Sequence, residues 1–160
     1  MSKTEHIDAF LPLGKHLSVV TKLYVGVLTK NLGHLVVERH FSILILVEKN
    51  KGKCTQQYLS DALYIDKASM VRIIDDFVKK DILKRTVNPN DRREHWIELT
   101  AKGKKMVPEI MKGVKDLNES ALKGLSKKQT DDFFATLKTI GNNLKDKPKN
   151  RVILNYKAKY

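Results

Sequence analysis

Hydrophobic and polar positions alternate along most of the chain with the three-and-four spacing of amphipathic helices. Between Ile7 and Leu32 this spacing predicts one long helix, which ends before Gly33. A second helix is predicted from about Val37 to Lys49, and its apolar residues, including the run "ILILV", surround it almost completely. A helix that is apolar on nearly all sides belongs inside a protein, so this one is predicted to be central.

Two shorter helices are predicted next, each with a residue that can cap its first turn. Thr55 can cap a helix from Gln56 to Leu63, and Asp66 can cap the stretch "KASMVRIIDDFVKK". The first helix is expected to bury Tyr58, Leu59 and Ala62. The second is expected to bury Val71, Ile74, Phe77 and Val78. The other face of the second then carries Lys67, Ala68, Ser69, Arg72 and Asp76.

The hydrophobic period then changes to that of strands. The segments "ILKRTV" and "HWIEL" are rich in residues that favour strands and flank the turn "NPND", which predicts a hairpin of Ile82–Val87 with Glu94–Leu99. Asn, Pro and Asp already supply the backbone conformations that a turn requires. The consecutive Arg92 and Arg93, expected at the tip, are therefore not needed for turning and are candidates for a contact outside the fold.

Two long helices complete the pattern. Thr100 can cap the first, and Ser126 with Gln129 matches a capping box for the second. Pro108 is expected to kink the first helix unless it lies in the first turns. The side chains expected to be buried are Val107, Ile110, Met111, Val114 and Leu117 in the first helix and Phe133, Leu137, Ile140 and Leu144 in the second.

The order of these elements predicts a mainly α fold that contains a winged helix-turn-helix. The two short helices, joined by the link "YI", make the helix-turn-helix, and the hairpin lies beside it as a wing. The second short helix is narrow enough to enter the major groove of DNA. Long helices flank this lobe at both ends of the chain.

Composition favours a polyanionic partner. Lys and Arg total 31 against 18 Asp and Glu, which gives a formal net charge of +13 and a pI near 9.8. Nucleic acid is the first expectation and an anionic membrane surface the second, but the apolar faces that a membrane-bound helix would expose are needed here for the core. No apolar run approaches the roughly 20 residues that cross a bilayer. The start "MSKTEHIDAF" lacks a signal-peptide pattern, so a cytoplasmic location is expected.

The sequence contains little that favours a catalytic or metal-binding function. The sequence has no Gly-rich phosphate loop, nucleophile elbow or His-Glu metal motif, so neither an enzyme nor a cofactor is expected. The five histidines are not closely spaced, and no metal site is expected. The single cysteine, Cys54, is expected to be an ordinary, partly buried residue rather than a redox sensor.

The stretch "DKASMVRIIDDFVKKDILKRTVNPNDRREHWIELTAKG" resembles the MarR family of bacterial and archaeal transcription regulators. It is similar to that family's recognition helix, its Asp-Arg-Arg wing and the Leu-Thr-x-x-Gly start of the next helix. The resemblance covers residues 32–103 in motif detail and residues 7–144 in helix layout. Asp81 stands where a glycine is most usual, and Val36 or Val37 occupies the N-cap position expected before the second helix.

The resemblance implies a homodimer whose long terminal helices interlock, with half-sites about one helical turn apart on a pseudo-palindrome. The implied organisation is an N-terminal dimerisation helix in residues 1–34, a DNA-binding lobe in 35–100, C-terminal dimerisation helices in 101–145 and a basic tail in 146–160. Family members often respond to small aromatic or anionic molecules. The candidate contacts for such an effector are His16, Tyr24 and His40.

The candidate major-groove contacts are Lys67, Ala68, Ser69 and Arg72. Arg72 can pair with guanine through two hydrogen bonds, Ser69 can bind phosphate or a base edge, and Ala68 can touch a thymine methyl. Asp75 and Asp76 would repel phosphate and are expected to point away from DNA.

The candidate wing contacts are Asp91, Arg92 and Arg93. By resemblance, Asp91 holds Arg93 extended through a salt bridge, Arg93 enters the minor groove and Arg92 faces phosphate. Further candidates for phosphate contacts are Thr55, Gln56 and Gln57, where a helix begins, and Lys84, Arg85 and Lys102.

Two functions remain open at this point. One is a sequence-specific, ligand-responsive repressor that binds double-stranded DNA. The other is a non-specific or architectural nucleic-acid binder, which would use the overall charge without reading bases. The cations of the tail that would serve the second are Lys145, Lys147, Lys149, Arg151, Lys157 and Lys159.

Overall fold

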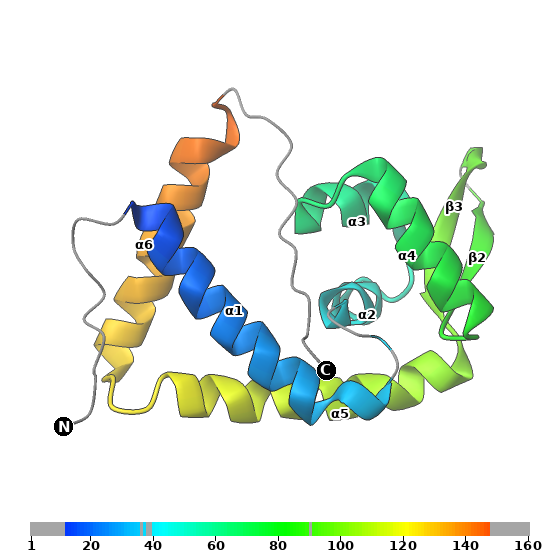
Figure 1. The fold of residues 1–160 in the computed structure, drawn as a ribbon. Helices are drawn as coiled ribbons and strands as arrows, with labels where there is room; N and C mark the ends of the chain where they lie inside the picture. Colours follow the sequence, from blue (N-terminus) through cyan, green and yellow to red (C-terminus); the bar gives the residue numbers. More distant parts are fainter. Residues whose placement is uncertain (1–11, 36, 38–39, 90, 148–160) are drawn as a thin grey trace. The chain divides into compact units, whose positions relative to one another are not determined.

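The structure, a computed structural model, describes residues 12–35, 37, 40–89 and 91–147. These described residues form two compact units, one within residues 27–116 and the other within residues 12–26 and 117–147. The elements are α1 (Leu13–Asn31), a 3-10 helix (Gly33–Leu35), α2 (Phe41–Lys49), β1 (Cys54–Thr55), α3 (Gln56–Leu63), α4 (Lys67–Lys79), β2 (Leu83–Asn88), β3 (Asp91–Leu99), α5 (Ala101–Ala121) and α6 (Lys127–Lys145) (Figure 1). The predicted fold class, mainly helical with a winged helix-turn-helix, is confirmed.

Within residues 27–116, α2 forms the centre of the lobe (Figure 1). It packs against α3 and β3, while α4 packs against α3 and β2. The central place predicted for α2 is confirmed, because four of its side chains are at most 3% exposed: Phe41, Ile43, Leu44 and Val47. These four side chains lie in the hydrophobic core of the lobe, together with buried residues of other elements such as Ile74, Phe77 and Ile97.

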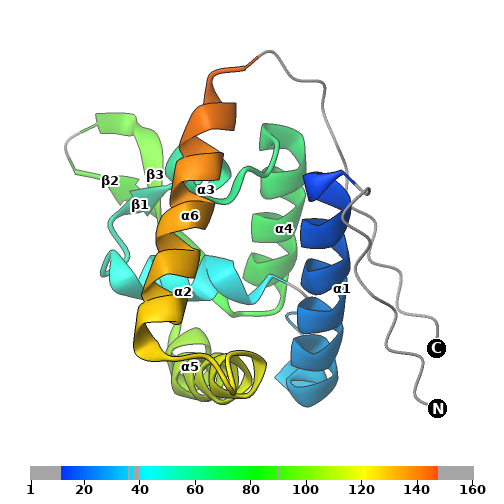
Figure 2. The same ribbon diagram turned by 90° about the vertical axis from the view of Figure 1, so that its left-hand side faces the viewer.

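A three-stranded antiparallel sheet closes the lobe, with the strand order β1-β3-β2 (Figure 2). Leu83 pairs with Leu99 in the predicted hairpin, and Cys54 pairs with Ile97 on the other edge of β3. Strand β1 was not predicted, because a strand of two residues is too short to show a period of two.

The predicted helix caps of the lobe are present. The hydroxyl oxygen of Thr55 accepts a hydrogen bond of 3.1 Å from the backbone N–H of Tyr58 at the start of α3. The carboxylate of Asp66 accepts one of 3.0 Å from the N–H of Ser69 at the start of α4. These contacts are local in sequence, which is why sequence patterns predict them well.

The start of α2 differs from the prediction. The helix begins at Phe41 rather than near Val37, and its N-cap is His40, whose side chain makes no capping hydrogen bond. The carbonyl of Val37 accepts a hydrogen bond of 3.0 Å from the N–H of His40. Val37 is fully buried and belongs to the core before the helix, and Val36 lies outside the described residues.

The buried faces of α3 and α4 also differ in part. In α3, Leu59 and Ser60 are buried, whereas Tyr58 is 43% exposed and Ala62 is exposed. In α4 the buried residues are Met70, Ile74 and Phe77. Val71, expected in the core, is 39% exposed, and Val78 is half-buried. The stripe is displaced because α4 packs against both α3 and β2, and this double packing decides which side chains face inward.

Helix α5 begins directly after the hairpin and is joined tightly to it. The predicted cap is present, since the hydroxyl oxygen of Thr100 accepts a hydrogen bond of 3.1 Å from the N–H of Gly103. A side chain at Gly103 would collide with the carbonyl oxygen of Ile82, so this close approach requires glycine. Pro108 lies inside α5, which continues past it to Ala121.

The buried face of α5 is shorter than predicted. The buried side chains of α5 are Met106, Val107 and Ile110. Met111 is 48% exposed, and Val114 and Leu117 are half-buried.

The second unit contains the first part of α1, the end of α5 and α6. The hydroxyl of Tyr24 donates a hydrogen bond of 2.7 Å to the side-chain carbonyl of Asn118. The capping box of α6 is confirmed, because Ser126 and Gln129 bond each other's backbone N–H groups.

The predicted burial of the apolar residues of α6 is wrong for the single chain. Phe133 is 44% and Leu144 is 58% exposed, while Leu137 and Ile140 are half-buried. Leu23 of α1, in the same unit, is 67% exposed. This unit therefore presents large apolar surfaces that its own described residues leave uncovered. None of the described helices is long and apolar enough to cross a membrane.

Candidate nucleic-acid interface

The first two turns of α4 carry the major-groove candidates. Lys67, Ala68 and Arg72 are exposed, and Ser69 is half-buried. The guanidinium of Arg72 donates a hydrogen bond of 3.2 Å to the hydroxyl oxygen of Ser69, one turn earlier.

The third turn of α4 is acidic, but each carboxylate has a basic partner. Asp75 lies 2.7 Å from the guanidinium of Arg85 on β2, and Asp76 lies 2.7 Å from the ammonium group of Lys80. These pairs reduce the repulsion that the two carboxylates would exert on phosphate. The first two turns carry the exposed cations Lys67 and Arg72 and no acidic residue, so they are the part of α4 best suited to a polyanion.

The polar side chains at the start of α3 make more hydrogen bonds within the protein than the sequence indicated. The hydroxyl of Thr55 serves as the helix cap, and its backbone pairs with that of Trp96. The side-chain carbonyl of Gln56 accepts a long hydrogen bond of 3.5 Å from Arg85. The amide of Gln57 donates to the carboxylate of Asp61 at 2.8 Å. Their side chains therefore have structural contacts in the free chain.

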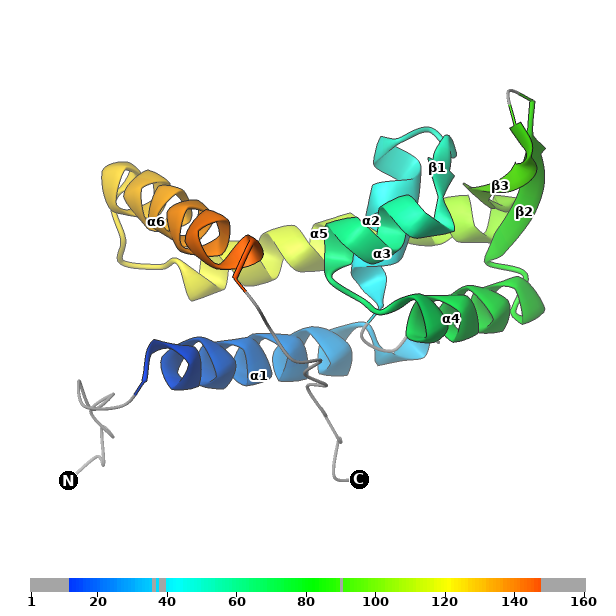
Figure 3. The ribbon, with the colours of Figure 1, turned by 90° about the horizontal axis from the view of Figure 1, so that it is seen from above.

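The wing presents its two arginines beyond the turn rather than at the tip. Strand β3 already begins at Asp91, so Arg92 and Arg93 lie inside the strand, and both are exposed. Figure 3 shows β2 and β3 side by side next to α4. The expected salt bridge between Asp91 and Arg93 is replaced by a hydrogen bond of 2.9 Å, in which the backbone N–H of Arg93 donates to the Asp91 carboxylate. This bond leaves the guanidinium free of Asp91.

Other cations of the lobe are held by internal contacts. The ammonium group of Lys84 lies 3.1 Å from the carboxylate of Glu98, and the hydroxyl of Thr86 donates to the same carboxylate at 2.7 Å. The hydrogen bonds from Thr86 and from Lys84 hold the pKa of Glu98 below its usual value. Lys102 donates to the backbone carbonyl of Lys80 at 2.7 Å. Lys84, Arg85 and Lys102 thus brace the lobe in this structure.

The three effector candidates do not share a unit. Tyr24 and His16 lie on α1 in residues 1–26, where burial raises the pKa of the Tyr24 phenol and His16 is half-buried. His40 belongs to residues 27–116, and its ring lies edge-on to that of Phe77 with 6.5 Å between centroids. This geometry gives His40 a packing contact next to α4.

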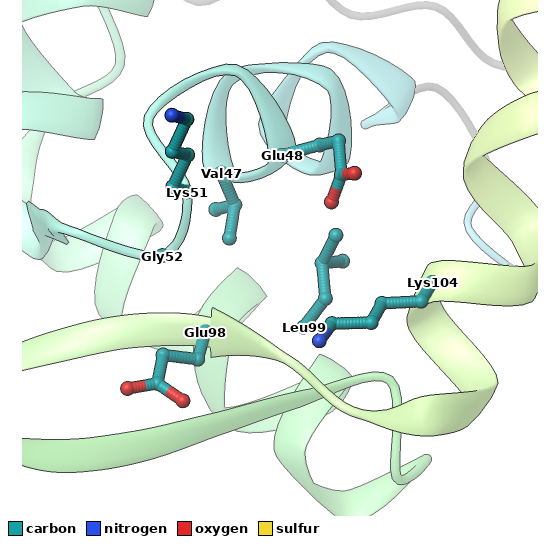
Figure 4. Close-up of a pocket in the computed structure, with 7 residues that line it drawn as sticks. All are labelled: Val47, Glu48, Lys51, Gly52, Glu98, Leu99 and Lys104. Atoms are coloured by element: carbon teal, nitrogen blue, oxygen red, sulfur yellow. The ribbon is translucent and has the colours of Figure 1, made fainter.

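A pocket of about 250 Å³ lies elsewhere in the lobe, between the end of α2, the base of β3 and the start of α5 (Figure 4). Its lining residues are Val47, Glu48, Lys51, Gly52, Glu98, Leu99 and Lys104. Charges of both signs line it, and it contains none of the predicted DNA or effector residues.

Cys54 is 3% exposed, and burial raises the pKa of its thiol to about 11. Such a thiol carries almost no thiolate at neutral pH, which agrees with the prediction of an ordinary buried cysteine. Within the described part of the chain, no group of three or more His, Cys, Asp and Glu side chains could hold a metal ion.

Sequence reasoning missed several contacts that shape this surface. The ion pair of Lys84 with Glu98 follows from the hairpin register, in which the two residues face each other, so opposite charges at facing positions were a usable signal. The pair of Asp75 with Arg85 joins different elements and has no such signal. The hydrogen bond of 3.2 Å from the Asn88 amide to the Glu94 carboxylate depends on an irregular wing.

Comparison with known proteins gives a consistent result. Residues 37–94, which span most of the lobe, match the model of the MarR family. A MarR family transcriptional regulator from Listeria monocytogenes, solved with a 26-mer DNA, has a TM-score of 0.79 at 23% identity over 85% of this chain and 91% of that one. A MarR regulator from Methanosarcina mazei has a TM-score of 0.72 at 25% identity over 81% and 94%. A cysteine-to-serine mutant of E. coli MarR, complexed with operator DNA, has a TM-score of 0.73 at 25% identity over 83% and 98%.

Proposed function

Because this chain belongs to the MarR family, we propose that it is a sequence-specific regulator of transcription that binds double-stranded DNA. In this proposal it is a cytoplasmic repressor that binds a pseudo-palindromic operator as a homodimer and is released by a small molecule. No enzymatic activity is proposed.

The observation that carries the proposal is the arrangement of exposed groups on one compact lobe. The first two turns of α4 and the arginine pair of β3 belong to the same unit of residues 27–116. A capped helix with Lys67 and Arg72 exposed suits the major groove, and an exposed arginine pair on a hairpin suits the adjacent minor groove. The solved structures of two similar proteins contain DNA, which supports this reading.

Each candidate residue then has a stated role. Arg72 leaves Ser69 to pair with guanine, and Ala68 permits close approach of the helix to the base edges. Arg93 enters the minor groove, where the narrow groove concentrates negative potential, and Arg92 binds phosphate. Contacts between lysine side chains and phosphates position the protein on the duplex, while contacts with the bases select the sequence.

The proposed homodimer is supported by the uncovered apolar side chains of the second unit. Leu23 on α1 and Phe133, Phe134 and Leu144 on α6 are all more than 40% exposed. Exposed apolar surface of this kind is unfavourable in water and marks an interface. The domain limits at residues 34, 100 and 145 form part of this proposal.

In the proposed dimer the two DNA-binding lobes can have a spacing that fits DNA or one that does not. The effector must bind one of these two conformations more tightly, because a ligand with equal affinity for both would not shift the equilibrium between them. His16, Tyr24 and His40 remain the candidate contacts. The chemical class proposed from the family resemblance is a small aromatic or anionic molecule.

The second candidate function, an architectural nucleic-acid binder, is favoured by the net charge of +13. It predicts binding that depends on salt but not on sequence. The two functions therefore differ in the role of Arg93, which reads the groove in the first and is one cation among 31 in the second.

The test is selection of bound duplexes from a random DNA pool at near-physiological salt, followed by affinity measurements on the enriched sequence. Enrichment of a pseudo-palindrome with half-sites about one helical turn apart is expected. Arg93→Ala is expected to weaken operator binding by roughly ten- to a hundredfold. The control Lys105→Ala removes an equal charge from an exposed site on α5 and is expected to act weakly. Deletion of residues 146–160 is expected mainly to reduce the salt dependence. Equal effects of both substitutions, with no enriched sequence, would favour the architectural function.

A further inference from the structure

The two strands of the wing lose their regular pairing at the outer end. Val87 pairs with His95, whereas the next residue of β2, Asn88, pairs with Asp91. Between these two pairs β2 advances by one residue and β3 by four, from 91 to 95. The intervening residues Arg92, Arg93 and Glu94 therefore form a bulge on β3. A bulge bends a strand and changes the direction of its side chains.

Two side-chain contacts hold this bulge, one at each end. The amide of Asn88, which is only 8% exposed, donates a hydrogen bond of 3.2 Å to the carboxylate of Glu94. The carboxylate of Asp91 accepts the hydrogen bond of 2.9 Å from the backbone N–H of Arg93. The first contact spans the bulge from β2 to β3, and the second fixes the backbone inside it.

The charge of Glu94 is unfavourable for the proposed function. It is an exposed carboxylate next to Arg93, in a segment proposed to approach two strands of phosphates. Through charge alone it would repel DNA. Its hydrogen bond with Asn88 favours DNA binding instead, because it restricts the motion of the backbone that presents Arg93.

We propose that Glu94 and Asn88 are positioning residues for Arg93. Their hydrogen bond holds the bulge in the shape that presents the Arg93 guanidinium for insertion into the minor groove. Pre-ordering of the wing reduces the conformational freedom that is lost on binding. This inference rests on the proposed function, since it assumes that Arg93 contacts DNA.

The pair Glu94→Ala and Glu94→Gln separates positioning from charge. Both substitutions remove the carboxylate, but only glutamine keeps an oxygen that can accept the hydrogen bond from Asn88. If Glu94 acts only through its charge, both variants bind the operator more tightly than the native chain. If it positions Arg93, Glu94→Gln binds at least as tightly as the native chain, and Glu94→Ala binds more weakly.

The expected loss for Glu94→Ala relative to Glu94→Gln is roughly three- to tenfold, as for the loss of one ordering hydrogen bond. The loss is expected in the preference for A·T-rich minor grooves at the wing position. The base preference of the α4 contacts is expected to stay unchanged, which a general loss of folding would not produce. Equal tightening of both variants, or no change in either, would overturn the proposal.

A second pair of variants tests the same contact, and the double variant of this pair keeps the native net charge. Asn88→Asp places a carboxylate opposite that of Glu94 and is expected to weaken binding. The double variant Asn88→Asp with Glu94→Gln has the native net charge and can form the hydrogen bond in the reverse direction, so it is expected to recover affinity. Failure of the double variant to improve on Asn88→Asp would contradict a positioning role.

Amide hydrogen exchange of the free protein makes the test independent of DNA. The N–H of Arg93 is expected to exchange faster in Glu94→Ala than in Glu94→Gln. If no duplex is bound selectively but this exchange difference is found, the proposed function fails and the structural contact stands. If selective binding is found without the exchange difference, the positioning proposal fails and the function stands.

Discussion

The guanidinium of Arg85 lies 2.7 Å from the carboxylate of Asp75 and thereby links strand β2 of the wing to helix α4. The same guanidinium reaches the side chain of Gln56 on α3 at 3.5 Å. One side chain thus joins three elements of the lobe formed by residues 27–116. It also neutralises a carboxylate on the helix that is proposed to enter the major groove.

Loss of Arg85 is therefore expected to affect DNA binding more than stability. Arg85→Ala should lower the free energy of unfolding by only about 0.5–1 kcal/mol, because both partners are partly exposed. It should weaken operator binding several-fold, because Asp75 is left without its cation on α4. Urea unfolding and DNA affinity, measured on the same preparations, check the two effects.

The double variant Arg85→Ala with Asp75→Asn provides the control. It removes the uncompensated carboxylate and should recover much of the lost affinity if repulsion by Asp75 is the cause. If the double variant binds no better than Arg85→Ala, Arg85 acts by contacting DNA itself, and its assignment as an internal brace is wrong.

A second prediction concerns the thiol of Cys54. Its pKa is raised to about 11 by burial, above the 9.0 of an unperturbed thiol. The native protein should therefore react very slowly with iodoacetamide at pH 8 and rapidly after unfolding. Mild oxidants should leave operator affinity unchanged. Fast labelling of the native protein would show that the thiol is accessible.

The same shift has a consequence for stability at high pH. The folded state holds the thiol proton more tightly than the unfolded state, so the contribution to stability is complete below pH 9 and is lost as the pH rises to about 11. The difference in unfolding free energy between the native chain and Cys54→Ala should be constant below pH 9. Above pH 9 the unfolding free energy of the native chain should fall relative to that of Cys54→Ala. A difference that stays constant up to pH 11 would contradict the raised pKa.

Local features of this fold were predictable from the sequence, whereas features set by packing were not. The caps at Thr55, Asp66 and Ser126 depend on a few adjacent residues and are present as predicted. The exposure of Val71 depends on how α4 packs on α3 and β2, which periodicity alone does not determine. Phe133 was expected in a core because an apolar stripe looks the same whether its own chain or a second chain covers it.

The candidate DNA surface shows the same division. The exposure of Lys67, Ala68 and Arg72 follows from the amphipathic pattern of α4 and is present in the structure. The bulge that carries Arg92 and Arg93 could be found only once the strand register was known. A shift of one residue in that register would turn every side chain of the strand to the other face of the sheet.

A third prediction concerns Asp81, at the end of α4. Its φ of 55° is left-handed, and two hydrogen bonds surround it, from the N–H of Ile82 to the carbonyl of Phe77 at 2.8 Å and from its own N–H to the carbonyl of Val78 at 3.0 Å. This is the Schellman arrangement, in which glycine is favoured at this position. This geometry is a physical reason for the glycine that is most usual at this position in the family, and Asp81 departs from that pattern.

Asp81→Gly should raise the free energy of unfolding by about 0.5–1 kcal/mol, because the strain of a left-handed non-glycine residue exceeds the added flexibility of glycine. Asp81→Asn is the control, since it removes the charge while keeping a side chain that tolerates this conformation. Urea unfolding of the three proteins measures the difference. Equal stabilisation by Asn and Gly would assign the gain to charge rather than to backbone conformation.

The last prediction concerns Val71, an apolar side chain that is 39% exposed on α4. It lies one turn after Ala68 and next to Arg72, which places it on the face proposed to meet the bases. An apolar side chain in the major groove recognises the methyl group of thymine. We therefore expect a thymine in each half-site of the operator that contacts Val71.

Replacement of that thymine by uracil removes only the methyl group and should weaken binding about fourfold, the equivalent of about 0.8 kcal/mol for one buried carbon. In Val71→Ala the same replacement should have little effect, because the partner of the methyl group is gone. Uracil at a thymine outside the half-sites serves as the control. The four affinities form a double-mutant cycle, and an equal uracil penalty with Val71 and with Ala would show that another residue contacts the methyl group.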